Sequence, residues 1–426
     1  MQASPRARRM RIIALSLLVV AGTVNYLDRS ALSIGNAPIR ADLHLSDTEM
    51  GLLLSVFEAA YGIAQIPAGL LVDRVGAHRA LGASLLVWSA AQVASAFSSG
   101  LGGFAAARAA LGVGESPMYL GGTKVCSNWF VRDRRAWPIG LFNASSALGP
   151  ALAPPLLTAL LVAFGWRTMF LAVGVLGALV GLAWVLLYRD PLQAGIGAEE
   201  RAALLAQDQG APPPTAGRLA PLLREPTSWG MALGFGGVIY LTWLYGTWLP
   251  DYLQRARHLS LAAAGLWTAV PQFCGFLGAL SSGLFARLLI GRGATPLMGC
   301  KLPLIAGMVV TAACTAGAAL VHGVGPAIAL VSAALFAASL ASSCGWSMAA
   351  IATGPDRVAT LEAVQNVGGS IGGALAPLVT GAIVGATGSF TPALLLAAVV
   401  ALLSALVYAL LVRERAGLHG AAVAAT

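Results

Sequence analysis

The stretch that decides the fold is GLLVDRVGAHR, residues 69–79. It places one carboxylate and two arginines between two long apolar runs, near 48–72 and 78–98. A helix needs roughly 20 mostly apolar residues to cross the hydrocarbon core of a bilayer. The pattern therefore predicts two membrane helices joined by a short charged loop that stays at one face of the membrane.

The composition of the whole chain agrees with a membrane protein. Of its 426 residues, 58% are hydrophobic and only 10% are charged, and the mean hydropathy is +0.78. A soluble domain carries about 25% charged residues, so too few charges remain here to cover a water-facing surface. The net charge is +9, but the basic residues sit at the ends of apolar runs, so we expect no nucleic-acid partner.

Apolar runs of spanning length recur along the chain. We therefore predict an all-α membrane protein with twelve transmembrane helices in two six-helix bundles, embedded in the lipid bilayer. The runs lie near 12–36, 48–72, 78–98, 101–126, 136–161, 166–188, 228–253, 261–287, 296–321, 325–350, 358–386 and 391–412.

A polar segment separates the sixth run from the seventh. Residues 189–227 contain no stretch that could span, and they include three consecutive prolines. We predict an N-terminal bundle over 1–188, a cytoplasmic linker over 189–227, a C-terminal bundle over 228–415 and a short cytoplasmic tail over 416–426.

The basic residues orient this layout. With the N-terminus inside, 19 of the 26 Lys and Arg residues fall in cytoplasmic segments, four in outer segments and three within helices. That asymmetry matches the positive-inside rule, and an odd number of helices would break it in one half. We expect a multi-pass protein of the bacterial cell inner membrane with both termini in the cytoplasm.

The two halves carry a weak repeat. Residues 283–292 read GLFARLLIGR and follow the second helix of their half, as residues 69–79 do, with Ala286 where the aspartate would be. Repeated halves are how many transporters build a binding site at the bilayer midplane.

Several motifs carry a family resemblance. G-x-L-x-D-R-x-G-x-x-R at 69–79 resembles the loop signature of the major facilitator superfamily. Four further motifs together resemble the anion:cation symporter family, which includes bacterial galactonate, glucarate, hexuronate, tartrate and phthalate permeases and the animal sialic acid and vesicular glutamate transporters. They are NYLDR at 25–29, Y-x-x-x-Q-x-P-x-G at 61–69, R-x-x-L-G-x-G-E-S-P at 108–117, and Q-N-x-G-G at 365–369 followed by Ala376-Pro377.

The resemblance implies a fold and a function. It implies the major facilitator fold and a proton-coupled symporter that imports a small organic anion by alternating access. Within the site, it implies that Arg29 binds the substrate carboxylate and that Asp28 and Glu115 carry protons. It further implies a cytoplasmic gating loop that clasps the two halves, formed by Gly69, Asp73, Arg74, Gly76 and Arg79.

Ionisable groups at membrane depth point to the same region without the resemblance, because burying them there is costly. Arg108 and Glu115 are seven apart, nearly two helical turns, so both face the same way. A guanidinium binds both oxygens of a carboxylate, so a substrate could compete with a buried acid for an arginine and shift its proton. A static ion pair that fixes helix packing is the alternative reading. Lys124 is expected to extend to the membrane surface.

Polar stripes on three other helices extend the candidate site. Tyr61 and Gln65 share one face of the second helix with Glu58, and Asn366 and Ser370 share one face of the eleventh with Glu362. In the resembled family an asparagine is frequent at 370 and a glutamine occurs near Ser145 and Ser146. The shorter serines fit a smaller carboxylate as well as a sugar acid. The candidate substrate-binding residues are Arg29, Tyr61, Gln65, Ser146, Trp243, Asn366 and Ser370, with Asp28, Arg108 and Glu115 for proton coupling.

Other classes of function find little support. The five cysteines form no CxxC pair and the histidines show no ligand spacing, so we expect no metal, no cofactor and no catalytic residues. We expect a monomer whose partners are a small organic anion, protons and lipid. An exchanger or exporter of the same anions, and a non-transporting membrane anion receptor, remain open alternatives.

Overall fold

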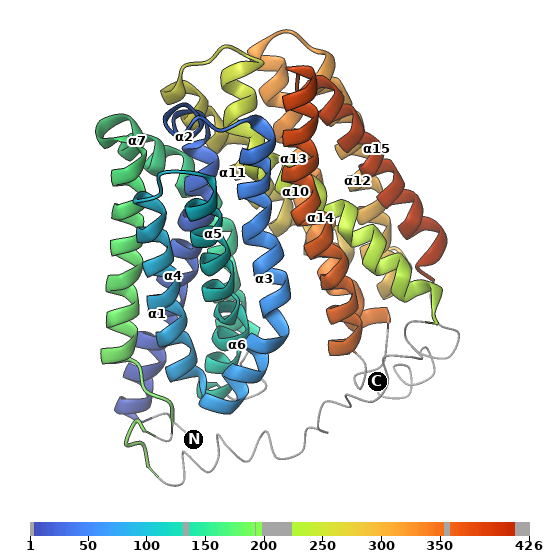
Figure 1. Ribbon diagram of the computed structural model, residues 1–426. Coiled ribbons are helices and arrows are strands. Elements are labelled where there is room, and N and C mark those ends of the chain that lie inside the picture. Colours follow the sequence, from blue (N-terminus) through green and yellow to red (C-terminus); the bar gives the residue numbers. More distant parts are fainter. Residues whose placement is uncertain (1–3, 131–135, 192, 198–223, 353–357, 414–426) are drawn as a thin grey trace. The chain divides into compact units, whose positions relative to one another are not determined.

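A computed structural model describes residues 4–130, 136–191, 193–197, 224–352 and 358–413. Most of the predicted linker, residues 198–223, lies outside this part of the chain. Within the described residues every regular element is a helix, which confirms the all-α prediction (Figure 1). Eight of the helices in the described part of the chain are long and apolar enough to cross a membrane.

The helices follow the predicted apolar runs closely. Their bounds are α1 Pro5–Ile34, α2 Asn36–Leu43, α3 Asp47–Val75, α4 Ala77–Ala96, α5 Leu101–Glu115, α6 Pro117–Trp129, α7 Ala136–Leu187, α10 Pro226–Arg255, α11 Leu261–Ile290, α12 Pro296–Leu320, α13 Val324–Ala352, α14 Val358–Thr387 and α15 Thr391–Leu411.

The chain divides into two compact units. The first comprises Met1–Ala211 with Ser260–Ala269, and the second comprises Pro212–Leu259 with Val270–Thr426. In the first unit α1 packs on α7, α4 on α7 and α5, and α3 on α5. In the second unit α10 packs on α14, and α12 on α15 and α13.

The element α7 is two helices in one. Gly165 has φ 79° and ψ 168°, a backbone conformation that a residue with a Cβ rarely adopts. Before this break, Gly149 packs against Tyr26 of α1; after it, Gly174 packs against Val93 of α4. If the two parts of α7 are counted as the fifth and sixth helices of the first unit, the fifth packs on the first (α1) and the sixth on the third (α4). The second unit repeats this pairing: its fifth helix, α14, packs on its first, α10, and its sixth, α15, packs on its third, α12.

The predicted helix over 101–126 is also interrupted, and this break was not expected. Pro117 has no N–H to donate to the Val113 carbonyl four residues back. The Ser116 hydroxyl donates to that carbonyl instead, at 2.8 Å. The chain therefore ends α5 at Glu115 and starts α6 at Pro117.

Two helix starts differ from the apolar pattern for a local reason. α1 begins at Pro5, before the apolar run, because the Ser4 side chain accepts a hydrogen bond from Ala7 N. α3 begins with a capping box in which Ser46 and Glu49 satisfy each other's backbone N–H groups. Short polar caps of this kind do not register as apolar runs.

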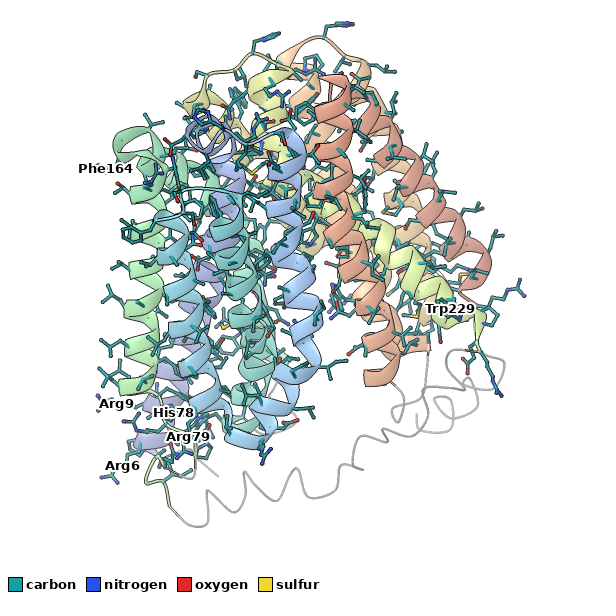
Figure 2. All side chains as sticks on the ribbon, in the orientation of Figure 1. Arg6, Arg9, His78, Arg79, Phe164 and Trp229 are labelled. Atoms are coloured by element: carbon teal, nitrogen blue, oxygen red, sulfur yellow. The ribbon has the colours of Figure 1, made fainter. Side chains whose placement is uncertain are left out.

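Several basic residues lie at one end of the first unit. Arg6, Arg9 and Arg79 lie at the lower end in Figure 2, whereas Phe164 lies at the opposite end. At the same lower end, Asp190 accepts hydrogen bonds from His78 N and from the Tyr188 hydroxyl. The end of α7 is thereby tied to the start of α4.

Candidate functional site

A buried ion pair lies at the centre of the candidate site. Nε of Arg29, on α1, donates to Oε2 of Glu115, the last residue of α5, at 2.8 Å. The Arg29 side chain is 11% exposed and that of Glu115 is not exposed at all. Because the pair is taken out of water, the energy of each charge depends strongly on keeping a partner.

Three aromatic rings surround the Arg29 guanidinium. Its Cζ atom lies 5.1 Å from the ring centre of Tyr26, 5.0 Å from that of Phe57 and 4.7 Å from that of Tyr61. Cation–π attraction stabilises a cation in such surroundings, more so when water is excluded. The guanidinium is therefore held in place by more than its carboxylate partner.

The Arg29 ion pair leaves hydrogen-bonding capacity unused. Nη2 of Arg29 and Oε1 of Glu115 are buried and have no hydrogen-bond partner among the described residues. A guanidinium offers its donors as a planar fork that matches a carboxylate. Arg29 therefore has a buried donor that Glu115 does not use.

Asp28 and Arg108 form the inner part of the same charged cluster. Asp28 is fully buried, and Arg108 is 1% exposed. Neither oxygen of Asp28 and neither Nε nor Nη1 of Arg108 has a partner in the described part of the chain. Arg108, Arg29 and Glu115 all lie within electrostatic range of Asp28, and Arg108 Cζ lies 4.9 Å from the Phe57 ring centre.

The cluster differs from the sequence-based interpretation in its pairing. Helical spacing suggested Arg108 as the partner of Glu115, but the hydrogen-bonded ion pair is formed by Arg29. Arg108 contributes at longer range, through its charge.

The predicted stripe on α3 reaches this cluster. Glu58 is 5% exposed and lies within electrostatic range of Arg29, as Tyr61 does. Gln65 is half-buried one turn beyond Tyr61. The sequence did not predict two of the residues that contact the Arg29 guanidinium, Tyr26 and Phe57. Each lies three or four residues from a predicted site residue on the same helix.

The other predicted site residues lie on α7 of the first unit and on helices of the second unit. Ser146, on α7, is half-buried and donates to the Asn143 carbonyl of its own helix at 2.7 Å. In the second unit, Trp243 on α10 and Asn366 and Ser370 on α14 are half-buried, on two helices that pack together. Gln365, beside Asn366, is buried and donates to the Gly345 carbonyl of α13 at 3.1 Å.

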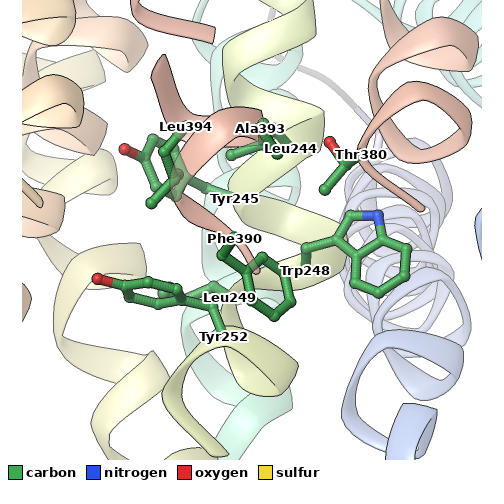
Figure 3. A pocket seen from close by; sticks show the side chains of 9 residues that line it. All are labelled: Leu244, Tyr245, Trp248, Leu249, Tyr252, Thr380, Phe390, Ala393 and Leu394. Atoms are coloured by element: carbon green, nitrogen blue, oxygen red, sulfur yellow. The ribbon is translucent and has the colours of Figure 1, made fainter. Parts of the chain in front are cut away.

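Among the cavities formed by the described residues of the second unit are the following two, and no predicted site residue lines either of them. One, of about 10 Å³, lies between α10, α14 and α15 and includes Trp248, Thr380 and Phe390 (Figure 3). The other, of about 470 Å³, is apolar and lies between α11, α12 and α13. The first is at the lower limit for one water molecule.

The charged loop after α3 is held within its own unit. Lys124 Nζ, on α6, donates to Asp73 Oδ1 at 2.5 Å, so its ammonium group pairs with a carboxylate near the end of α3. Arg74 and Arg79 are exposed. Gly76, with φ 84°, makes the turn between α3 and α4, whereas Gly69 meets only Leu120 nearby.

No group of three or more His, Cys, Asp or Glu side chains that could hold a metal ion is found among the described residues. The side chains gathered around Arg29 offer charge pairing, hydrogen bonding and two carboxylates that can hold a proton.

Comparison with known proteins places this site in context. Residues 18–361 match the family model of the Major Facilitator Superfamily. The chain is 40% identical over 379 residues to a probable L-galactonate transporter of Escherichia coli (strain K12), covering 88% of this chain and 84% of the relative. It is 30% identical over 343 residues to the hexuronate transporter of Bacillus subtilis (strain 168), covering 79% of each.

Solved structures agree on the fold. A bacterial homologue of the human lysosomal transporter Spinster, in an inward-facing and unoccupied conformation, superposes with a TM-score of 0.80 at 18% identity, covering 97% of this chain and 98% of that one. Its inward-facing and occupied form gives 0.77 at 20% identity, covering 95% and 97%. The expected transporter fold, and a role other than that of an enzyme, are confirmed: this multi-pass membrane protein belongs to the Major Facilitator Superfamily.

Proposed function

We propose that the protein is a proton-coupled symporter that imports a small sugar acid by alternating access. The observation that carries the proposal is the buried Arg29 guanidinium, which is ringed by aromatic side chains and has a buried Nη2 without a partner among the described residues. Relatives named for galactonate and hexuronate transport support a sugar acid as the organic anion.

Competition for Arg29 supplies a route to proton coupling. A substrate carboxylate that binds the guanidinium draws it away from Glu115, and a carboxylate left unpaired at membrane depth is costly. Uptake of one proton converts Glu115 to the neutral acid and removes that cost. Asp28, buried beside both arginines, is a second carboxylate on which a proton can reside.

The same proposal includes the predicted topology. We propose twelve spanning helices in two six-helix bundles, with both termini in the cytoplasm of a bacterial cell. The protein would lie in the inner membrane as a monomer. The two-part α7 and the repeated helix pairing support the twelve-helix arrangement. The charged loop at 69–79 would clasp the two halves in one state and release them in the other, because charged contacts at a surface can be made and broken as bundles move. Asn366, Ser370 and Trp243 would complete the site from the second half.

Transport by purified protein in sealed liposomes tests the proposal. We expect a pH gradient, acidic outside, to drive accumulation of L-galactonate above its outer concentration, and we expect R29A to abolish both binding and uptake. R167A, at an exposed arginine that pairs with Asp42, is the matched control and should transport normally.

The alternatives give different results in the same assay. Uptake that depends on internal substrate but ignores the pH gradient would indicate an exchanger, and binding without any flux would indicate a receptor. Wild-type affinity in R29A would exclude the carboxylate role of Arg29.

A further inference from the structure

Tyr119 holds a fixed position next to the charged cluster. It lies on α6, two residues after Pro117, and its ring stacks on Phe142 of α7 with the ring centres 5.0 Å apart and the planes at 29°. A Cβ at Gly122, three residues on, would lie 2.4 Å from the Phe142 ring, so α6 and α7 are in close contact there. The direction of the Tyr119 ring is therefore restricted by its packing against Phe142.

The Tyr119 hydroxyl is buried and forms no hydrogen bond of normal geometry with the described residues. Its oxygen is out of contact with solvent and has no hydrogen-bond partner among the described residues. Ser145 lies close enough to interact weakly with it; because the Ser145 hydroxyl donates to the Phe142 carbonyl, at 2.6 Å, only its oxygen is left to accept. A buried phenol normally finds a partner, because leaving a polar group unpaired costs about 1–3 kcal/mol.

The surroundings of this hydroxyl are those of the candidate site. Tyr26, Arg29 and Tyr61 are its electrostatic neighbours, and two of the three contact the guanidinium through their rings. Tyr119 lies four residues after Glu115, and Ser116 between α5 and α6 keeps helical backbone angles (φ −57°, ψ −31°). Tyr119 and Glu115 are therefore about one helical turn apart and face the same way. A ligand whose carboxylate binds Arg29 would have its adjoining carbon atoms near Tyr119.

We propose that Tyr119 is a specificity-determining residue that donates its O–H to a hydroxyl of the substrate close to the carboxylate. The inference rests on the proposed transport of a sugar acid and adds the group that recognises it as a hydroxy acid. A site built to hydrogen-bond a substrate hydroxyl rejects the analogue that lacks it, because its own polar group is then left buried and unpaired.

The competing explanation is that Tyr119 only packs against Phe142. Replacing it by phenylalanine separates the two, since Y119F retains the ring and its stacking and removes the hydroxyl alone. Y408F is the matched control: Tyr408, on α15, packs against Gly234 of α10 and also has a buried hydroxyl with no partner in the described part of the chain.

Binding to the purified full chain tests the proposal, with L-galactonate and its 2-deoxy and 3-deoxy analogues as ligands. We expect Y119F to bind L-galactonate about tenfold more weakly than the wild type, and to bind one deoxy analogue as well as the wild type does. Y408F should bind all three like the wild type. The deoxy analogue that Y119F binds as tightly as the wild type does lacks the hydroxyl that Tyr119 contacts, and so identifies it.

Three outcomes would overturn the inference. Equal loss of affinity for all three ligands in Y119F would indicate a packing role, and unchanged affinity for all three would mean that the hydroxyl contacts no substrate. A wild-type protein that binds none of them would overturn the proposed sugar-acid transport and this inference together, whereas the first two outcomes leave transport standing.

Discussion

Glu115 has two carboxylate oxygens in different surroundings, and this difference defines its expected role. Oε2 accepts the Arg29 Nε–H, whereas Oε1 is buried with no partner among the described residues. An amide in place of the carboxylate can still accept a hydrogen bond at one atom, but it can no longer gain or lose a proton.

We therefore predict that E115Q separates exchange from accumulation. Counterflow exchange of substrate between the two faces of a liposome should persist, whereas accumulation driven by a pH gradient should be lost. Both are measured with labelled substrate on the same preparation. E49Q is the control, because Glu49 acts in the capping box of α3. Normal gradient-driven accumulation by E115Q would remove this residue from the coupling path.

At the scale of helices, α3 and α5 approach unusually closely where they position the site. A Cβ at Gly112 of α5 would lie 2.4 Å from the Phe57 carbonyl oxygen and 3.0 Å from Tyr61 N. Both contacts are with backbone atoms, which cannot rotate away as a flexible side chain can. Because α3 brings Phe57 and Tyr61 to Arg29, any separation of the two helices also moves the aromatic ring set.

We predict that G112A destabilises the protein by roughly 1–3 kcal/mol and weakens substrate binding. Thermal unfolding in detergent and a binding titration measure the two effects. G103A is the control on the same helix, since a Cβ at Gly103 would meet nothing within 4 Å; it should be neutral or slightly stabilising. Equal melting temperatures for the two variants would contradict the close approach.

A second contact between elements depends on pH. Asp42 of α2 accepts hydrogen bonds from Arg167 and from Trp166 Nε1, the two residues after the break in α7. The bond from the Arg167 guanidinium holds the pKa of Asp42 below its ordinary value, and the Trp166 bond adds to this. A lowered folded-state pKa gives stability that is present above the unfolded value, about 3.9, and is lost as pH falls through the folded value.

The melting temperature of the wild type should therefore fall more steeply than that of D42N when the pH is lowered below about 4. The effect should be small, because Asp42 is exposed and exposed pairs contribute little. Parallel curves for the two proteins would show that the contact does not tie α2 to α7 in solution.

At the scale of the whole molecule, the topology turns on whether α7 crosses the membrane once or twice. The break at Gly165 predicts two crossings. Alkaline phosphatase fused after residue 258, between α10 and α11, should then be active, and the same fusion after residue 292, between α11 and α12, should be inactive. Fluorescent-protein fusions should give the reverse pattern. If α7 crossed the membrane only once, each of the four fusions would give the opposite result.

Much of the architecture was predictable because hydropathy and turn residues are local properties. The apolar runs located α3, α12 and α15 to within a few residues, and the gap between the runs 136–161 and 166–188 contains Gly165. The break before Pro117 was missed, since the residues on both sides of it are equally apolar. The short helix α2 was missed because it is too polar and too short to register as a span.

The site was predictable in composition but not in pairing. Asp28, Arg29, Arg108 and Glu115 stand out from the sequence as charges at membrane depth, and the structure gathers them in one cluster. Helical spacing could compare only residues of one helix, and so it paired Glu115 with Arg108. The bond to Arg29 depends on how α1 lies against α5, which is a property of the folded unit.

The two lysines of the chain, Lys124 and Lys301, have a practical consequence for chemical labelling. Lys301 is buried, and its ammonium group donates to the Ala409 and Val412 carbonyls at the end of α15; Lys124 is about one-third exposed beside Asp73. Amine-reactive dyes should therefore modify a single internal position without any lysine having to be removed. That dye would sit on the partner of the charged loop, where its fluorescence would report when the loop changes its contacts.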